Sequence, residues 1–173
     1  DESSESSVDL SNIASAMITE GTTEALTTDY AYIMNDDGTI SVSAYTGSDT
    51  DLTVPGLIDG YVVTGIADHA FEANADIKSI TLPNGLITIG ESAFSDCSSL
   101  TTVVIPDTVG TIRRGAFISC TALTTLDIPA SVTEIMEEAF TGCAALKDLT
   151  VESSTVEFTN WWVDTDEIPS DLT

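Results

Sequence analysis

Three cysteines are the first side chains in this sequence whose type and spacing could do chemistry. Cys97, Cys120 and Cys143 follow one another at intervals of 23 residues. Structural zinc sites use cysteines two to four residues apart, and this chain has no such pair. Stacked coils of a repeat would bring the three thiols within roughly 5 Å of one another, near the reach of a disulfide. Their side chains would be parallel, however, and their number is odd, so we expect free thiols that are buried as small hydrophobic groups.

The single histidine, His69, is the other candidate for catalysis. A general base needs a positioned partner and a pocket, and no serine or cysteine near His69 stands out as an activated nucleophile. The chain also lacks both glycine-rich phosphate-binding patterns, G-x-x-x-x-G-K-[ST] and G-x-G-x-x-G after a strand. We therefore predict a protein that is not an enzyme and that has no catalytic residues and no cofactor.

An acidic turn is the best candidate for metal binding. The run Asn35–Gly38 contains two aspartates, but an EF-hand needs acidic side chains at alternate positions, and Ile33 breaks that pattern. An Asp-Gly pair is a strong signal of a β-hairpin turn, so the sequence favours a turn here and predicts no metal site. Weak calcium binding by Asp49, Asp51 and Asp59 in a folded loop remains an alternative.

The charge of the chain excludes several partners. Four basic residues stand against 29 acidic ones, which gives a net charge of −25. Nucleic acid and anionic lipid both need Lys or Arg to neutralise phosphate, so neither is expected as a partner. No apolar stretch approaches the ~18 residues of a membrane span, so we expect no direct membrane insertion. A hydrophobic content of 42% is nevertheless typical of a folded domain.

The elements that position these side chains come from an internal repeat. An Ala-Phe pair recurs every 23 residues, with phenylalanine at Phe71, Phe94, Phe117 and Phe140. Other columns keep the same phase, among them the aliphatic residues Ile66, Ile89, Ile112 and Ile135. Because one copy cannot bury its apolar face alone, the pattern predicts stacked coils that share one core.

One copy shows how a coil is built. Its segment Leu100–Pro106 is typical of a short strand, in which Val103 and Ile105 point to the same side because side chains alternate, and Pro106 ends the hydrogen-bonding ladder. The segment Gly115–Cys120 then returns the chain through an expected helical or 3₁₀ turn. The phenylalanines are predicted to lie in the core rather than in a site.

These units resemble the BspA-like leucine-rich repeat family of bacterial surface and secreted proteins. The similarity is carried by Ile80–Pro83, by Ile89–Leu100 and by the two units that follow, and it covers roughly residues 50 to 151. The glycine that this family has after the aliphatic residue is kept only at Gly90, and Asn74 replaces the first cysteine. The resemblance implies an α/β-type leucine-rich-repeat solenoid with short parallel strands and 3₁₀ or helical turns, a fold that is also classed as mainly β.

The chain divides into four expected segments. They are an acidic, serine-rich tether with a possible short helix (1–29), an N-terminal capping hairpin (30–55), about four leucine-rich repeats (52–151) and an irregular C-terminal cap or further coil (152–173). The pair Trp161-Trp162 would cover the open end of the core. About five extra residues enter the first unit near Asp59. The polar start is similar to the spacer that follows the lipidated cysteine of bacterial lipoproteins, although no signal is visible in this chain.

A binding surface of a solenoid is formed by the strand residues that point away from the core. The alternation predicts such a face at Ser79, Thr81, Thr102, Val104, Thr125, Asp127, Asp148 and Thr150. Arg113 and Arg114 form the one local basic spot. They either pair with neighbouring acids or meet an acidic partner.

The function predicted from these features is a non-catalytic extracellular module of a bacterial cell-surface or secreted protein. The family resemblance implies adhesion or ligand binding, with host or bacterial surface proteins as partners. We expect a monomer. The alternative is a structural spacer that displays a further domain of a longer parent protein.

Overall fold

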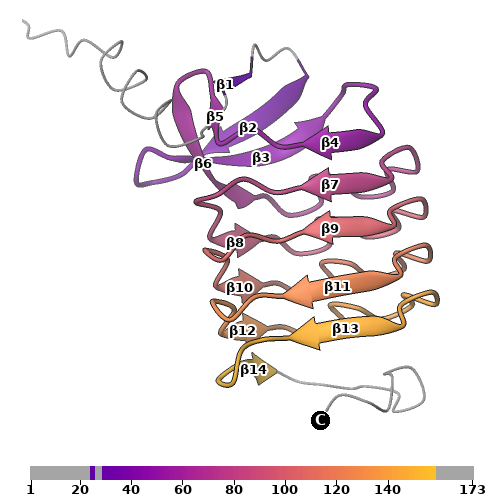
Figure 1. The fold of residues 1–173 in the computed structure, drawn as a ribbon. Coiled ribbons are helices and arrows are strands. Elements are labelled where there is room, and N and C mark those ends of the chain that lie inside the picture. The colour runs from indigo at the N-terminus through magenta and orange to yellow at the C-terminus, as the bar shows by residue number, and fades with distance from the viewer. Residues whose placement is uncertain (1–23, 26–28, 159–173) are drawn as a thin grey trace, which may run out of the picture.

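A computed structural model describes residues 24–25 and 29–158, which wind into a solenoid of stacked coils (Figure 1). This part of the chain contains fourteen strands and no helix. None of its segments is therefore a helix that could cross a membrane. The short helix expected within residues 1–29 falls on residues that are not described, apart from Glu24–Ala25, which form strand β1, and the cap expected around Trp161 and Trp162 also lies outside the described residues.

Five short strands run parallel along one side of the solenoid, and we call them the front strands. They are β4 (Asp51–Thr53), β7 (Ser79–Thr81), β9 (Thr102–Val104), β11 (Thr125–Ile128) and β13 (Asp148–Val151). The register repeats the sequence period, with Ile80 opposite Val103 and Leu126 opposite Leu149. Between β9 and β11 the regular ladder of hydrogen bonds is interrupted, and the Thr124 N–H donates to the Thr101 carbonyl at 3.5 Å. All five strands still lie side by side in Figure 1.

A second row of parallel strands, the rear strands, lies on the opposite side of each coil. They are β6 (Tyr61–Ile66), β8 (Thr88–Ile89), β10 (Thr111–Ile112), β12 (Glu134–Ile135) and β14 (Glu157–Phe158). Each pairs with the next in a shift of one repeat, so that Ile66 faces Ile89 and Ile135 faces Phe158. The aliphatic column seen in the sequence is thus one ladder of the core.

The N-terminal end of the solenoid carries two hairpins. Strands β2 (Tyr30–Met34) and β3 (Ile40–Tyr45) are antiparallel, and their turn closes at Gly38 with a φ of 84°. Strand β3 also pairs in parallel with β6, which joins this hairpin to the rear strands. The second hairpin links β5 (Leu57–Ile58) to β6, and β5 also pairs with β1 (Glu24–Ala25). Its turn residues Asp59 and Gly60 have φ of 51° and 81°, a turn of the I′ kind that accounts for the extra residues in the first unit.

The phenylalanine column forms a stack through the core. Ring centroids lie 5.1 Å apart between Phe71 and Phe94, 5.2 Å between Phe94 and Phe117, and 6.0 Å between Phe117 and Phe140. The first three rings are at most 3% exposed, as predicted for core residues. Phe140 is only partly buried.

The return segment of each coil consists of turns, which confirms the mainly β form of the predicted solenoid. Two residues per coil have positive φ, at columns His69, Ser92, Gly115, Glu138 and Ala73, Asp96, Ser119, Gly142. A left-handed residue every fourth position interrupts any helix. Backbone N–H groups alternate between the next coil, as when Phe94 donates to the Ala116 carbonyl at 2.8 Å, and the carbonyl three residues earlier, as when Ser95 donates to Ser92 at 3.1 Å. The helical or 3₁₀ turn expected here is therefore a series of separate i→i+3 turns that stack from coil to coil and do not continue into a helix.

Candidate functional site

The outward residues of the front strands form one continuous surface, the front face. All eight strand residues predicted for it point away from the core, and they are exposed except for Ser79, which is half-buried. Two further residues of β4, Asp51 and Thr53, belong to the same columns and were missed by the sequence reasoning. The shared triplet Asp-Leu-Thr at Asp51–Thr53 and Asp148–Thr150 is the signal that could have found them.

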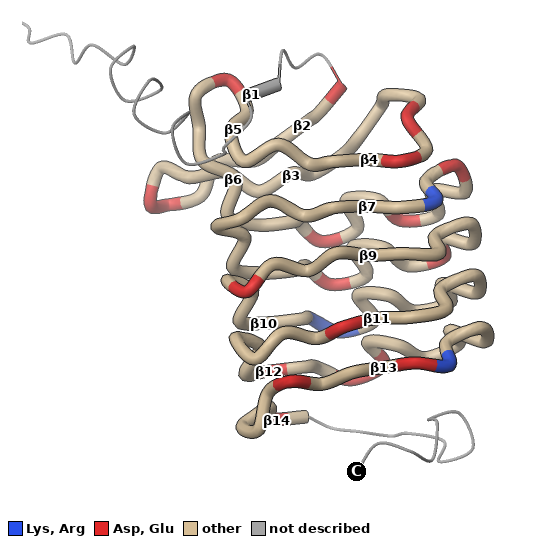
Figure 2. Tube along the Cα trace, in the orientation of Figure 1, with Lys and Arg blue, Asp and Glu red and all other residues tan. Residues whose placement is uncertain are grey.

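The front face has aspartates on β4, β11 and β13 and none on β7 and β9, and the exposed Lys78 and Lys147 lie directly before β7 and β13 (Figure 2). Asp51 lies at the N-terminal end, where the Ser79 hydroxyl donates to its carboxylate at 2.6 Å. Asp127 and Asp148 lie toward the other end, on β11 and β13. Between them Val104 is half exposed and is the one large hydrophobic side chain exposed on the described front strands. Such a surface offers a flat β-branched centre between carboxylate edges.

Arg113 and Arg114 do not lie on the front face, because they follow the rear strand β10. The Arg113 guanidinium lies 3.5 Å from the Asp68 carboxylate, and Arg114 forms an ion pair with Glu91. The Glu91 carboxylate raises the pKa of Arg114 further. Of the two alternatives for this basic spot, pairing with neighbouring acids is what the structure shows. The predicted interaction residues thus belong to two separate surfaces.

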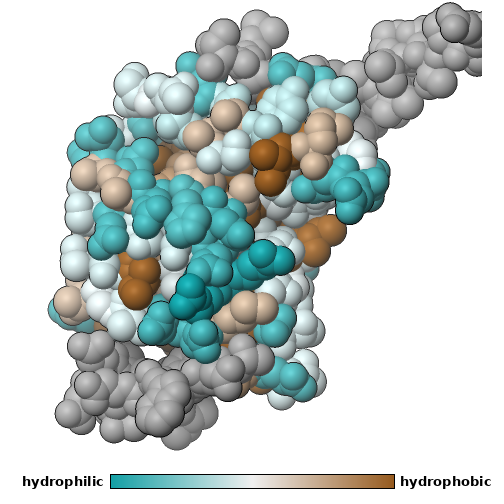
Figure 3. All heavy atoms as spheres, turned by 180° about the vertical axis from the view of Figure 1, so that it is seen from behind, coloured by the Kyte–Doolittle hydropathy of each residue, from teal (hydrophilic) through white to brown (hydrophobic). Residues whose placement is uncertain are grey.

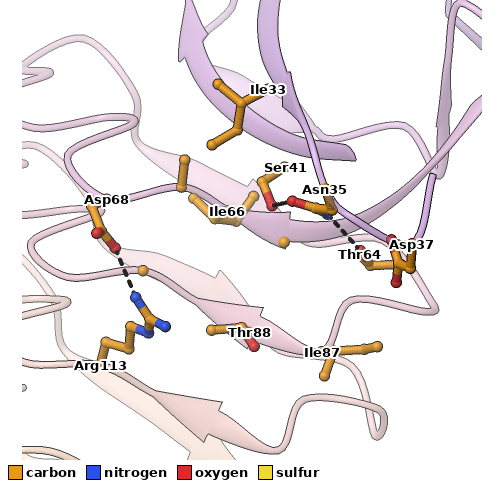
Figure 4. A pocket seen from close by; sticks show the side chains of 13 residues that line it. Ile33, Asn35, Asp37, Ser41, Thr64, Ile66, Asp68, Ile87, Thr88 and Arg113 are labelled. Carbon is orange, nitrogen blue, oxygen red and sulfur yellow. Dashed lines mark hydrogen bonds and ion pairs between the residues drawn. The ribbon is translucent and has the colours of Figure 1, made fainter. Parts of the chain in front are cut away.

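A hollow of about 370 Å³ lies on the rear side, where the β2–β3 hairpin overhangs the rear strands (Figure 4). Ile33 and Ile87 form apolar parts of its wall, and each is about half exposed. Asp37 lies near one end of the hollow, and the pair of Asp68 and Arg113 lies near the other. Seen from behind, hydrophobic side chains surround a strongly hydrophilic centre on this side of the molecule (Figure 3).

A hydrogen-bond network holds the hairpin over this hollow. The Asn35 amide donates to the hydroxyls of Thr39 and Thr64 at 2.9 and 3.2 Å and accepts from Ser41 at 3.0 Å. The Thr39 hydroxyl and backbone N–H both donate to Asp37 Oδ1, at 2.6 and 2.9 Å. These bonds lower the pKa of Asp37, so its carboxylate is charged near neutral pH.

All three cysteines are free thiols, and Cys97 and Cys120 are buried as predicted, whereas Cys143 is half-buried. The three thiols also make a repeated hydrogen bond. Each Sγ donates to a phenylalanine carbonyl one coil earlier, at 3.1 Å, in the pairs Cys97 with Phe71, Cys120 with Phe94, and Cys143 with Phe117. Burial raises the pKa of Cys97 to about 12. A thiol that stays protonated is a poor nucleophile and a poor metal ligand.

The other candidates for chemistry do not assemble into a site in the described residues. His69 is exposed, and its Nδ1 lies 2.9 Å from a carboxylate oxygen of Glu72. It does not line the rear hollow. No group of three or more His, Cys, Asp or Glu side chains in this part of the chain is arranged to hold a metal ion. Asp49, Asp51 and Asp59 are therefore not brought together as a calcium site.

Comparison with known proteins agrees with this architecture. The BspA type leucine rich repeat region matches residues 62–163 in six copies. A leucine-rich repeat protein from Bacteroides capillosus is 31% identical over 75% of this chain and 98% of its own, with a TM-score of 0.67. One from Bacteroides ovatus is 25% identical over 79% of this chain and 41% of its own, with a TM-score of 0.63.

More distant structures share the fold. The leucine-rich repeat protein of T. pallidum is 22% identical over 79% of this chain and 86% of its own, with a TM-score of 0.57. No curated protein matches the sequence. Together with the coil geometry, the family match over more than half of the sequence shows that the chain belongs to the BspA-type leucine-rich repeat family.

Proposed function

We propose that this chain is an extracellular module of a bacterial cell-surface or secreted protein and that it binds a protein ligand through its front face. The observation that carries the proposal is the front face itself, a continuous surface of ten outward residues on five strands. Leucine-rich repeat proteins typically mediate protein–protein interaction and are generally not enzymes, which supports a role in binding. Adhesion to host or bacterial surface proteins is the corresponding biological role.

The front face is built to bind with little loss of entropy. Its side chains are short, and β-branched Thr and Val have few rotamers to lose. Inward neighbours such as Ile80 and Leu126 are 1% exposed, so the strands are held from behind by a packed core. A preformed surface of this kind contributes affinity by avoiding reorganisation on binding.

The charge of the front face indicates the partner. Asp51, Asp127 and Asp148 are exposed at its edges, and the chain as a whole has a net charge of −25. Lys and Arg side chains at the edge of a ligand's contact surface would complement these carboxylates and accelerate association at low salt. We therefore expect a partner whose contact surface is basic, and we expect the module to bind it as a monomer.

A binding screen with matched variants tests the proposal. The 173-residue chain would be measured by biolayer interferometry against purified extracellular-matrix and bacterial surface proteins. T102R and T125R place long cations in the centre of the front face and should abolish binding of a true ligand. A130R adds the same charge at an exposed turn residue beyond β11 and should leave binding intact. Equal effects of all three variants, or no ligand for the folded wild type, would count against the front face as a binding surface.

A structural spacer is the second candidate, and one observation favours it. The front face lacks the Trp, Tyr and Arg anchors that dominate most binding hot spots. If the chain is a spacer, a longer parent protein should keep its ligand binding when T102R and T125R are introduced together. Deletion of one 23-residue coil should then shorten the distance at which the parent protein displays its further domain, and it should leave the affinity for the ligand unchanged.

A further inference from the structure

We infer that the rear hollow beneath the β2–β3 hairpin receives the cationic side chain of a lysine or arginine from a partner protein. This inference rests on the proposed function only in that the side chain belongs to a protein. The hollow lies on the opposite side from the front face and is lined by other residues. It would therefore be a second contact, formed where the hairpin and the rear strands meet.

The walls of the hollow fit the stem of such a side chain. Ile33 is 52% exposed and Ile87 is 53% exposed, and both line the hollow. Ile33 comes from β2 above, whereas Ile87 lies just before β8 on the lower edge (Figure 4). Lys and Arg lay their methylene chains along apolar surface while their charged ends stay near polar groups. A stem lying between the two isoleucines would cover apolar surface that is otherwise in water.

The charges of the hollow fit the head group. Two carboxylates, Asp37 and Asp68, line it against one cation, Arg113. Arg113 already lies 3.5 Å from Asp68, which leaves Asp37 as the charge without an opposite partner in the hollow. Asp37 is exposed and is held in place by its two hydrogen bonds from Thr39. An acidic ligand would meet an arginine that is already paired, whereas a cation would meet an oriented carboxylate.

Hydrogen bonds and close packing hold the walls of the hollow in place. The network from Asn35 to Thr39, Thr64 and Ser41 fixes the overhang on strand β6. Directly after strands β6 and β8 the two coils approach closely, and a Cβ on Gly90 would lie 2.5 Å from the Ala67 carbonyl carbon. A volume of about 370 Å³ falls within the range of roughly 300–1,000 Å³ that is usual for ligand pockets. A partner side chain could therefore enter without rearrangement of the backbone.

The test uses small probes whose binding does not depend on the unknown partner. Nα-acetyl-lysine-N-methylamide and its uncharged norleucine analogue would be titrated into the ¹⁵N-labelled 173-residue chain and followed by amide chemical shifts. We expect saturable shifts at Ile33, Asp37, Thr64, Ile87 and Thr88 with the lysine probe, and weaker binding of the norleucine probe. D37N should weaken the lysine probe about threefold to fivefold, as expected for loss of one exposed ion pair.

Two matched controls keep the result interpretable. D107N removes the same charge from an exposed turn after β9 and should leave probe affinity unchanged. I87A should weaken both probes, whereas V104A truncates a similarly exposed side chain on the front face and should not. Melting temperatures of all variants would show that the fold is intact.

The outcomes separate this inference from the proposed function. Shifts spread over every acidic patch without saturation, equal binding of both probes, or equal effects of D37N and D107N would each overturn the assignment of the hollow. Probe binding that stays intact while no protein ligand responds to T102R would instead count against the front face alone. Loss of a protein ligand in T102R with no probe in the hollow would leave the proposed function standing and overturn this inference.

Discussion

Replacement of Gly90 by alanine should destabilise the solenoid, although the repeat itself suggests that the position is permissive. The equivalent residues in the other coils are Ala67, Arg113 and Met136, so an alignment of the copies predicts a harmless change. The geometry predicts otherwise. A Cβ on Gly90 would lie 2.5 Å from the Ala67 carbonyl carbon, 2.6 Å from the Asp68 nitrogen and 2.7 Å from the Ala67 oxygen. All three atoms are backbone, so no side chain can rotate out of the way.

The magnitude follows from two opposing effects. Forcing an extra methyl group against fixed backbone costs about 1–3 kcal/mol. Removing a glycine makes the unfolded chain less flexible and recovers about 0.4–1 kcal/mol. The net destabilisation should be about 1–2 kcal/mol, which corresponds to a fall in melting temperature of about 2–8 °C for a chain of this size. Thermal unfolding followed by circular dichroism at pH 7 would measure it.

Gly110 provides the matched control for this prediction. It follows Val109 in the next coil, and a Cβ placed on it would meet only the Ile87 carbonyl oxygen, at 4.0 Å. Its φ is also not positive, so G110A should leave the melting temperature unchanged or raise it slightly. If G90A proves as stable as the wild type, or if both variants lose the same stability, the close approach of coils at Ala67 is not what fixes this position.

Three further changes test the core and the turns. A73G should raise the free energy of unfolding by about 1 kcal/mol, because the exposed Ala73 has a φ of 57° that glycine adopts without strain. A130G is the control, and it should lower the free energy of unfolding because Ala130 has no positive φ. F94A should cost about 3–5 kcal/mol in urea unfolding, whereas F140A should cost clearly less because its ring is only partly buried; equal losses would mean that the stack is covered at both ends. Burial raises the pKa of Cys97 to about 12, so the folded state favours the protonated thiol. The contribution of this thiol to the free energy of unfolding is complete below the unfolded pKa of about 8.5 and is lost as the pH rises toward 12. The melting temperature should therefore fall between pH 8.5 and 11, and it should fall less in C97A.

The repeat could be predicted from the sequence because every coil buries the same columns of apolar residues. Ile89 and Ile112 stack on one another in the structure just as their spacing implies, and the phenylalanines fill the core between the two rows of strands. The path of the return segment was predicted less well. Residues with a left-handed backbone are expected to be glycine, but Ser92 and Asp96 have this conformation here. The residue types of the return segment therefore did not indicate turns in place of a helix.

The candidate sites were predictable only where they follow the period. The outward positions of β7 to β13 could be read from the alternation, since side chains of a strand point to opposite sides in turn. The rear hollow could not, because it depends on how the β2–β3 hairpin folds back over strands that are distant in sequence. Asn35 lies 29 residues from Thr64, yet their side chains are hydrogen-bonded. Neither residue belongs to a repeated column that would have marked it.

The column that breaks the family pattern is also the column that shapes the hollow. Ala67, Gly90 and Arg113 occupy equivalent positions in successive coils, and all three line the space beneath the hairpin. Small residues in the first two coils leave room below the overhang, and the arginine of the third coil reaches past Gly90 to Asp68 of the first. A column that served packing alone would not need an arginine paired two coils away. Variation within the repeat is therefore a better indication of this surface than the repeat itself, and the Asp37 and Ile87 variants measure its contribution to binding.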